Sequence, residues 1–189
     1  MKRTALALAL VATCAFAGPA SQPLRPSAQG WVTSDGAPAP AAPYRASAEA
    51  FCAQLVVVSD PRFLRKWQHE PATVEPDSIT SIATGREFLA VVMFANPATG
   101  DDGQSRLSVS YRVRRPDGKT AAAIMEQDDR IGPPPRKDML ELTTGTMMGN
   151  FDPTDPPGPY LFEAELRDRV SGQTLHLERK VELVASERS

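Results

Sequence analysis

The chain has 189 residues, of which 23% are charged and 41% hydrophobic, as is typical of a single soluble globular domain. Its formal net charge of −2 leaves no basic stripe to neutralise phosphates, so we expect neither a nucleic-acid partner nor a polybasic membrane-surface patch. The 18 prolines must lie mostly in loops, strand edges and tails, because proline lacks the backbone N–H that helices and sheets require.

Residues 1–17 have the three parts of a signal peptide. Lys2 and Arg3 form a positive start, residues 5–12 form an apolar run, and residues 15–17 (Ala-Phe-Ala) form a small-x-small cleavage site. The apolar run is too short for a transmembrane helix, and no later stretch is long enough. Without Lys2 and Arg3, the 21 basic residues fall to 19 against 23 acidic ones, a net charge of −4. We therefore expect a periplasmic or secreted protein with no transmembrane segment.

The two cysteines leave two questions open. Residues 11–14 (Val-Ala-Thr-Cys) resemble a bacterial lipobox, although Thr13 stands where that signal has Gly, Ala or Ser, so Cys14 is a possible lipid anchor. If Cys14 is removed with the signal peptide, Cys52 is the only cysteine in the mature chain, which excludes an intramolecular disulfide. Its interpretations are a small buried hydrophobe, an intermolecular disulfide or a reactive thiol.

Residues 18–47 are rich in Ala, Pro, Ser and Gly, and such a segment cannot bury enough apolar surface to offset its conformational entropy. We predict a disordered linker here. Trp31 is its one large side chain, and we expect it to be exposed unless it docks on the domain.

From residue 50 the pattern changes to short strands and one helix. The β-branched run 51–58 predicts a strand. Ser59 or Asp60 can cap a following helix, and Pro61 suits its first turn. This helix extends to about His69. Its apolar side chains (Phe63, Leu64 and Trp67) share one face, and its basic ones (Arg62, Arg65 and Lys66) share the solvated face.

The strand predicted over residues 88–95 is apolar at every position, so it should be central and covered on both faces. The opposite sheet can cover one face, and either the helix with Trp67 or a protein partner can cover the other. Residues 79–84 predict a short edge strand closed by Gly85.

The second half of the chain predicts alternating strands. Residues 106–114 alternate strictly, a turn at 115–119 follows, and the chain returns as a strand over 120–125. A stiff loop, Gly132 to Arg136, precedes short strands at 139–143 and 146–151. Residues 160–167 and 174–183 then form a hairpin, in which Arg179 occupies an inward position. A β-bulge, or a strand end that extends beyond the core, would explain why a charged residue occupies this inward position.

Strands at this spacing indicate an antiparallel sandwich. The segments 111–118 (Tyr-Arg-Val-Arg-Arg-Pro-Asp-Gly) and 155–168 (Asp-Pro-Pro-Gly-Pro-Tyr-Leu-Phe-Glu-Ala-Glu-Leu-Arg-Asp) resemble strands of bacterial extracytoplasmic immunoglobulin-like domains. Residues 50–184 are similar to small exported proteins of Gram-negative bacteria. The resemblance implies a mainly β fold: one antiparallel immunoglobulin-like β-sandwich of about seven strands with one short helix. We place this domain at residues 48–185.

No catalytic motif is present, and two histidines, His69 and His176, cannot form a three-histidine metal site. We expect a non-enzyme without a cofactor, and assign no catalytic, cofactor-binding or metal-ligating residue. Two further sets of residues could form metal sites, although structural roles also explain them. Loop aspartates could bind Ca²⁺ (Asp101, Asp102, Asp152, Asp155 and Asp168), although turn formation explains them. Methionines with His176 could bind Cu(I) (Met125, Met139, Met147 and Met148), although core packing explains them.

These observations favour a non-catalytic protein-binding or adaptor module of the bacterial cell envelope. It would act through the second face of the central strand or through the loops at 96–104 and 130–138. The alternatives are a small-ligand or metal carrier of the periplasm and an inhibitor of an envelope enzyme that uses the loop at 131–137. The partner and the oligomeric state stay open.

Overall fold

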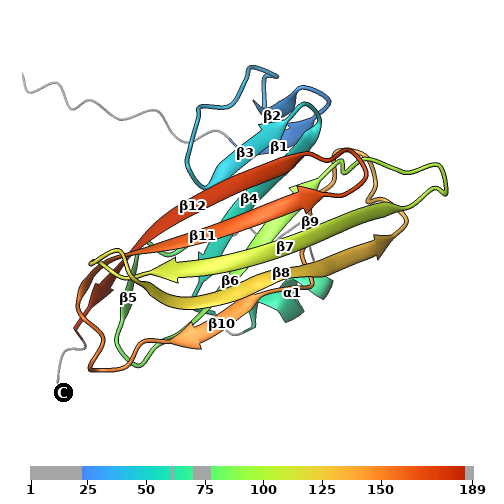
Figure 1. Ribbon diagram of the computed structural model, residues 1–189. Coiled ribbons are helices and arrows are strands. Elements are labelled where there is room, and N and C mark those ends of the chain that lie inside the picture. The colour runs from blue at the N-terminus through green and yellow to red at the C-terminus, as the bar shows by residue number, and fades with distance from the viewer. Residues whose placement is uncertain (1–22, 61, 70–77, 186–189) are drawn as a thin grey trace, which may run out of the picture.

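The computed structural model describes residues 23–60, 62–69 and 78–185, so the predicted signal peptide at 1–17 lies outside the described residues. Figure 1 shows the arrangement of the elements. In chain order they are β1 (Leu24–Ser27), β2 (Gly30–Thr33), β3 (Arg45–Ala48), β4 (Phe51–Val58), α1 (Phe63–His69), β5 (Ser81–Ala83), β6 (Glu87–Ala95), β7 (Ser105–Arg114), β8 (Thr120–Gly132), β9 (Glu141–Leu142), β10 (Met147–Asn150), β11 (Gly158–Asp168) and β12 (Thr174–Val184).

The protein is mainly β, and α1 is the one helix among the described residues. Twelve strands form three sheets within that part of the chain, in place of a single sandwich of about seven strands. One five-stranded sheet has the order β10-β6-β4-β3, with β9 also paired to β6, and we call it the covered sheet. The other has the order β5-β12-β11-β7-β8, and we call it the open sheet. A two-stranded hairpin, β1-β2, is the third.

The two five-stranded sheets enclose the main hydrophobic core. Inward side chains of β4 and β6, such as Leu55 and Phe94, pack there with inward side chains of the open sheet, such as Val109 and Phe162. Strict alternation along β7 and β11 places one apolar set inside, as their sequences predict. Because β4 and β6 are apolar on both sides, they need a second cover on their outer face.

Helix α1 supplies that second cover. Val56, Val91 and Met93 point outward from the covered sheet and form a separate cluster with Phe63, against which Trp67 packs. This confirms the prediction that the helix carrying Trp67 covers the central strand. Asp60 caps the helix: its carboxylate accepts the backbone N–H of Arg62 at 2.9 Å, and its backbone carbonyl accepts that of Phe63 at 3.0 Å.

The predicted disordered linker at 18–47 is wrong for much of its length, since β1, β2 and most of β3 lie within it. Trp31 is only 7% exposed, and its indole N–H donates to the carbonyls of Ala46 and Ala53 at 3.1 and 3.2 Å. Gly30, with φ of 97°, lies so close to Ser47 that a β-carbon would come within 2.5 Å of its hydroxyl. The hairpin is therefore docked tightly on the covered sheet.

The inward position of Arg179 is due neither to a β-bulge nor to a strand end that extends beyond the core. It stays in regular register opposite Phe162, so its side chain points inward from β12. Its Nε donates to the carbonyl of Leu55 in the covered sheet at 3.2 Å, and its guanidinium lies 3.9 Å from the ring centre of Tyr44. Burial lowers the pKa of the Arg179 guanidinium. The arginine thus closes one side of the core between the two sheets.

Candidate functional site

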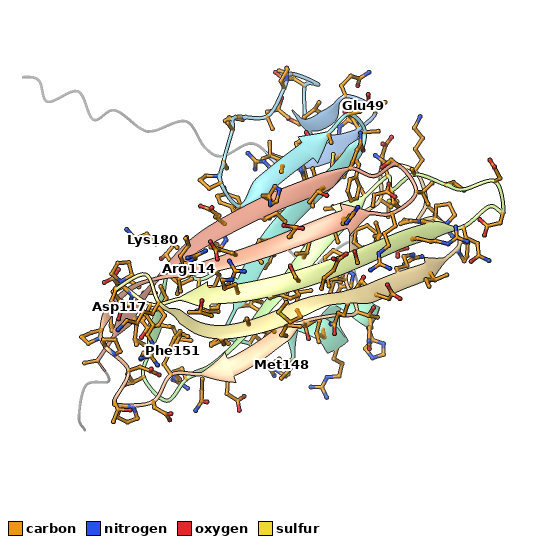
Figure 2. The ribbon with its side chains drawn as sticks, in the orientation of Figure 1. Glu49, Arg114, Asp117, Met148, Phe151 and Lys180 are labelled. Atoms are coloured by element: carbon orange, nitrogen blue, oxygen red, sulfur yellow. The ribbon has the colours of Figure 1, made fainter. Side chains whose placement is uncertain are left out.

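The two sheets differ in how their outer faces are covered. On the covered sheet, α1 packs over one end and the β1-β2 hairpin over the other. On the open sheet, outward side chains of β7, β8, β11 and β12 face solvent, as the side chains in Figure 2 show around Arg114 and Lys180. The route to a partner through the second face of the central strand is thus closed by α1, and the open sheet provides the broad free face.

A shallow groove of about 260 Å³ crosses the outer face of the open sheet. It forms where small residues, Ser110 and Ala123, stand beside longer side chains on neighbouring strands. The longer side chains that line it are Arg112, Met125, Glu126, Glu163, Glu165, His176 and Glu178. We refer to this feature as the sheet-face groove.

Ion pairs organise the groove. The carboxylate of Glu163 lies 2.9 Å from Nε of Arg114 and 3.8 Å from Nη1 of Arg112. Glu165 lies 3.3 Å from Nδ1 of His176, a contact that becomes an ion pair only when the imidazole is protonated. Two cations thus meet one carboxylate, that of Glu163, while Glu165 lies beside the imidazole of His176.

Strand β8 borders the groove and forms one edge of the open sheet. It is the longest strand that the structure describes, with 13 residues, and most of them are exposed. Met125 is 81% exposed. Three register irregularities against β7 twist the strand.

The C-terminal end of β8 is fastened by the segment that joins β9 to β10. The carboxylate of Asp129 accepts the backbone N–H of Gly145 at 2.6 Å, and its carbonyl accepts the Thr144 hydroxyl at 2.6 Å. Burial raises the pKa of the Asp129 carboxyl, against the opposing effect of these hydrogen bonds. The free part of the β8 edge is therefore its N-terminal part, residues 120–128.

The buried hydroxyl of Tyr111 also binds the segment that joins β9 to β10. It donates to the carbonyl of Gly145 at 2.8 Å and accepts the backbone N–H of Val92 at 3.2 Å. Thr143 completes the set, 3.0 Å from the tyrosine oxygen. Burial raises the pKa of Tyr111, so this hydroxyl stays neutral and serves as a structural link between the sheets.

The aspartates weighed as calcium ligands lie at opposite ends of the molecule. Asp102 pairs with Arg106, and Asp168 accepts the backbone N–H groups of Ala98, Val170 and Ser171, all near the start of β7. Asp155 lies 3.5 Å from Arg115, beyond the other end of β7, and accepts the backbone N–H of Asp152. Each carboxylate whose contacts are given has a local structural partner. No group of three potential His, Cys, Asp or Glu ligands occurs in the described part of the chain.

The methionines weighed as copper ligands are also separated. Met125 and His176 both line the sheet-face groove. Met147 is buried in the core, while Met148 points outward from β10 and is 68% exposed (Figure 2). Adjacent residues on opposite faces of a strand cannot serve one metal site.

The two loops named as binding candidates meet at one end of the molecule. Asn96 donates to the carboxylate of Asp138 at 3.0 Å and accepts its backbone N–H at 2.8 Å. In the second loop, Ile131 is 64% exposed, and prolines 133–135 follow it. Cys52 lies fully buried nearby, and burial raises its thiol pKa to about 11. These values favour the interpretation of Cys52 as a small buried hydrophobe.

Sequence reasoning missed the open edge of β8. It ended the strand near residue 125 and treated 130–138 as a loop, whereas β8 continues to Gly132. The available signal was the run Ala121 to Met125, which does not alternate as a half-buried strand would.

Among the described residues, no helix is long and apolar enough to cross a membrane. No family model and no curated protein matches the chain. Two similar solved structures are the Pseudomonas fluorescens alkylpurine DNA glycosylase AlkC bound to DNA containing an abasic site analog and a family 123 glycoside hydrolase from Clostridium perfringens. The first has a TM-score of 0.36 at 15% identity over 56% of this chain, and the second has 0.39 at 10% identity over 72%. The chain spans 28% of the length of each.

Both of these structures are of enzymes, which contradicts the expectation that the protein is not an enzyme. That expectation is withdrawn. Because both TM-scores are below 0.5, neither structure carries an argument about the activity or substrate of this chain.

Proposed function

We propose that the protein is an exported protein-binding or adaptor module of the bacterial cell envelope that holds its partner at the β8 edge and the adjoining sheet-face groove. The observation that carries this proposal is the open edge of β8. Long unpaired edges offer a row of backbone hydrogen-bonding groups, and proteins commonly use them to bind a strand of a partner.

The proposal includes an immunoglobulin-like fold for the two packed sheets. In such folds, a tyrosine near the start of one strand hydrogen-bonds back to the backbone a few residues upstream. The Tyr160 hydroxyl donates to the carbonyl of Pro156 at 3.1 Å, which fits this feature. The strand order β12-β11-β7-β8 likewise fits the G-F-C-C′ sheet of variable-type domains.

The proposed location is periplasmic or secreted. It rests on the basic, apolar and small-residue parts of the first 17 residues, with Cys14 as the alternative lipid attachment point.

Site-specific photo-cross-linking in cells tests the binding surface. A photoreactive phenylalanine at Met125, on the β8 edge, should give one reproducible adduct with another envelope protein. The same residue at Met148, which is similarly exposed but lies on β10, should give none.

Adducts from Met148 without adducts from Met125 would overturn the proposed surface. A third position, Ile131, separates the inhibitor hypothesis from this one. Adducts confined to Ile131 would move the contact to the proline loop and away from the sheet edge.

A further inference from the structure

We propose that the loop after β8, residues 132–138, is a second contact surface of the protein and binds a protein groove that is lined by aromatic side chains. We call this segment the proline loop. It lies at one end of the sheets and does not use the β8 edge, so this surface goes beyond the proposed function. Three features of the loop carry the proposal: its backbone conformation, its fastened ends and its exposed apolar side chains.

Three consecutive prolines fix the conformation of the proline loop. Pro133, Pro134 and Pro135 directly follow the last residue of β8. Each proline ring holds its own φ at about −65° and forces the residue before it into an extended conformation. No peptide bond in the described part of the chain is cis, and the run itself belongs to no strand. We therefore infer the extended, left-handed conformation of polyproline II for this run.

Both ends of the proline loop are fastened to the sheets. At its start, Gly132 pairs with Ser105 of β7, and its carbonyl also accepts the Ser105 hydroxyl at 3.2 Å. At its end, Asp138 exchanges two hydrogen bonds with Asn96, at 3.0 and 2.8 Å. A segment that is already held in its bound conformation loses little conformational freedom on binding, which favours affinity.

The apolar side chains of the loop and its flanks face solvent. Pro133 and Pro134 are exposed, and Pro135 is partly exposed. Just before the loop Ile131 is 64% exposed, and just after it Met139 is 49% exposed. Apolar side chains that are exposed together, and not singly, indicate a contact surface.

The chemistry of the prolines determines which kind of surface fits them. Because proline has no backbone N–H, the run cannot donate hydrogen bonds to the edge of a partner sheet. A polyproline II segment is instead bound in grooves whose walls are aromatic side chains, against which the proline rings pack. The conformation of the run is already fixed, so little conformational entropy opposes this mode of binding.

Two cations follow the prolines and can orient the loop in such a groove. Arg136 and Lys137 are exposed, and neither takes part in an ion pair within the described part of the chain. A guanidinium can stack on an aromatic ring or pair with a carboxylate at the rim of the groove. Asp138 is the one acidic residue of the loop, and it accepts a hydrogen bond from Asn96. Charge therefore sets the direction of the bound loop, and the prolines provide most of the contact.

Site-specific photo-cross-linking of the full chain in cells tests this surface. A photoreactive phenylalanine replaces Lys137, which leaves all three prolines in place. We expect an adduct with one protein, and mass spectrometry of the cross-linked peptides should map the contact to exposed tryptophan or tyrosine residues of that protein. The matched control is the same substitution at Asp117, an exposed turn residue at the opposite end of β8 (Figure 2), which should give no such adduct.

The affinity of the purified full chain for the captured protein tests the role of the prolines. The double variant Pro133→Ala/Pro134→Ala should weaken binding at least about tenfold, because it removes two rings and frees the backbone. Pro134→Ala alone replaces it in case the double variant folds poorly. Arg136→Ala should weaken binding about threefold. Pro116→Ala removes an exposed proline from the turn at the other end of β8 and should leave the affinity unchanged. Isothermal titration calorimetry measures these affinities.

The absence of a protein adduct from Lys137, adducts with lipid alone, or a mapped contact without aromatic residues would each overturn the aromatic-groove proposal. Unchanged affinity of the folded proline variants would overturn it as well. If Met125 still cross-links an envelope protein in those cases, the proposed function stands without this second surface. If Lys137 captures an aromatic groove while Met125 captures nothing, the proline loop stands and the β8 surface fails.

Discussion

Among the residues that the structure describes, three other than glycine have a positive φ, and a hydrogen-bond network joins their segments. Glu49, Asn96 and Asp138 have φ values of 54°, 53° and 59°. Asn96 donates to the carbonyl of Ala50, beside Glu49, and exchanges two hydrogen bonds with Asp138. Asparagine tolerates this conformation better than most residues, so Asn96 can hold three loops together at one end of the sheets.

Replacing Asn96 should separate the cost of backbone strain from the cost of lost hydrogen bonds. Asn96→Gly tolerates the φ value but loses the bonds, so we expect a decrease of about 1–3 kcal/mol in the free energy of unfolding. Asn96→Ala also adds backbone strain and should cost about 1 kcal/mol more. Urea unfolding measures both values, and equal stabilities of the two variants would exclude the strain.

At the scale of single elements, α1 depends on the charge of its cap. The hydrogen bond from Lys66, followed by that from the Arg62 backbone, lowers the pKa of the Asp60 carboxyl to about 2. A lowered carboxyl pKa stabilises the fold above the unfolded value near 3.8, and this contribution is lost as the pH falls through 2. Because Asp60 is solvent-exposed, we expect a small effect.

Asp60→Asn keeps an oxygen that can cap the helix and removes only the charge. We expect it to lower the Tm slightly at pH 6 and to have a much smaller effect near pH 2, where the native carboxyl is itself half protonated. Thermal unfolding followed by circular dichroism at both pH values is the measurement. A difference that persists undiminished near pH 2 would assign the effect to something other than the charge.

The sequence predicts best those elements in which the spacing of apolar and polar residues follows which side chains are buried. β7 and β11 alternate because one face lies in the core, and α1 combines a cap with apolar spacing. β8 is exposed on most of its length, so no alternation marks it, and residues 126–130 resemble a charged loop. Charged residues occupy the outer face of any solvated sheet, so the sequence pattern does not show which of them lie together in the groove. That grouping follows only from the register of four strands.

At the scale of the whole molecule, the β1-β2 hairpin completes the cover of one sheet. Its amino-acid composition resembles a disordered segment, and it is held by long-range contacts from Trp31 to the carbonyls of Ala46 and Ala53. These long-range contacts cannot be predicted from the residues that surround Trp31 in the sequence. Cys52 lies beneath the hairpin, since the backbone of Ser27 is hydrogen-bonded to its thiol.

Removing the hairpin anchor should therefore expose the thiol. We expect Cys52 to react very slowly with a thiol reagent in the native protein, because the group is buried and its raised pKa keeps it protonated. Trp31→Ala should release the hairpin and accelerate labelling at least about tenfold, and should cost about 3–5 kcal/mol of stability.

Trp67→Ala is the matched control, because it removes a tryptophan from the other cover of the same sheet. Trp67→Ala should accelerate the labelling of Cys52 only through global unfolding, by the amount expected from its lower free energy of unfolding. Equal labelling rates in the two variants at equal stability would show that the hairpin does not shield Cys52.

The order of strands in the open sheet also sets an order in time. β5 pairs only with β12, in parallel from Ser81 to Ala83, and β12 in turn lies beside β11. Synthesis proceeds from the N-terminus, so β5 waits about a hundred residues for the strand that completes its edge. A nascent chain that has not reached Thr174 can form neither that pair nor the final hairpin. The last strand that the structure describes is therefore an interior one, and the open sheet cannot close around its core until residues 174–184 have been made.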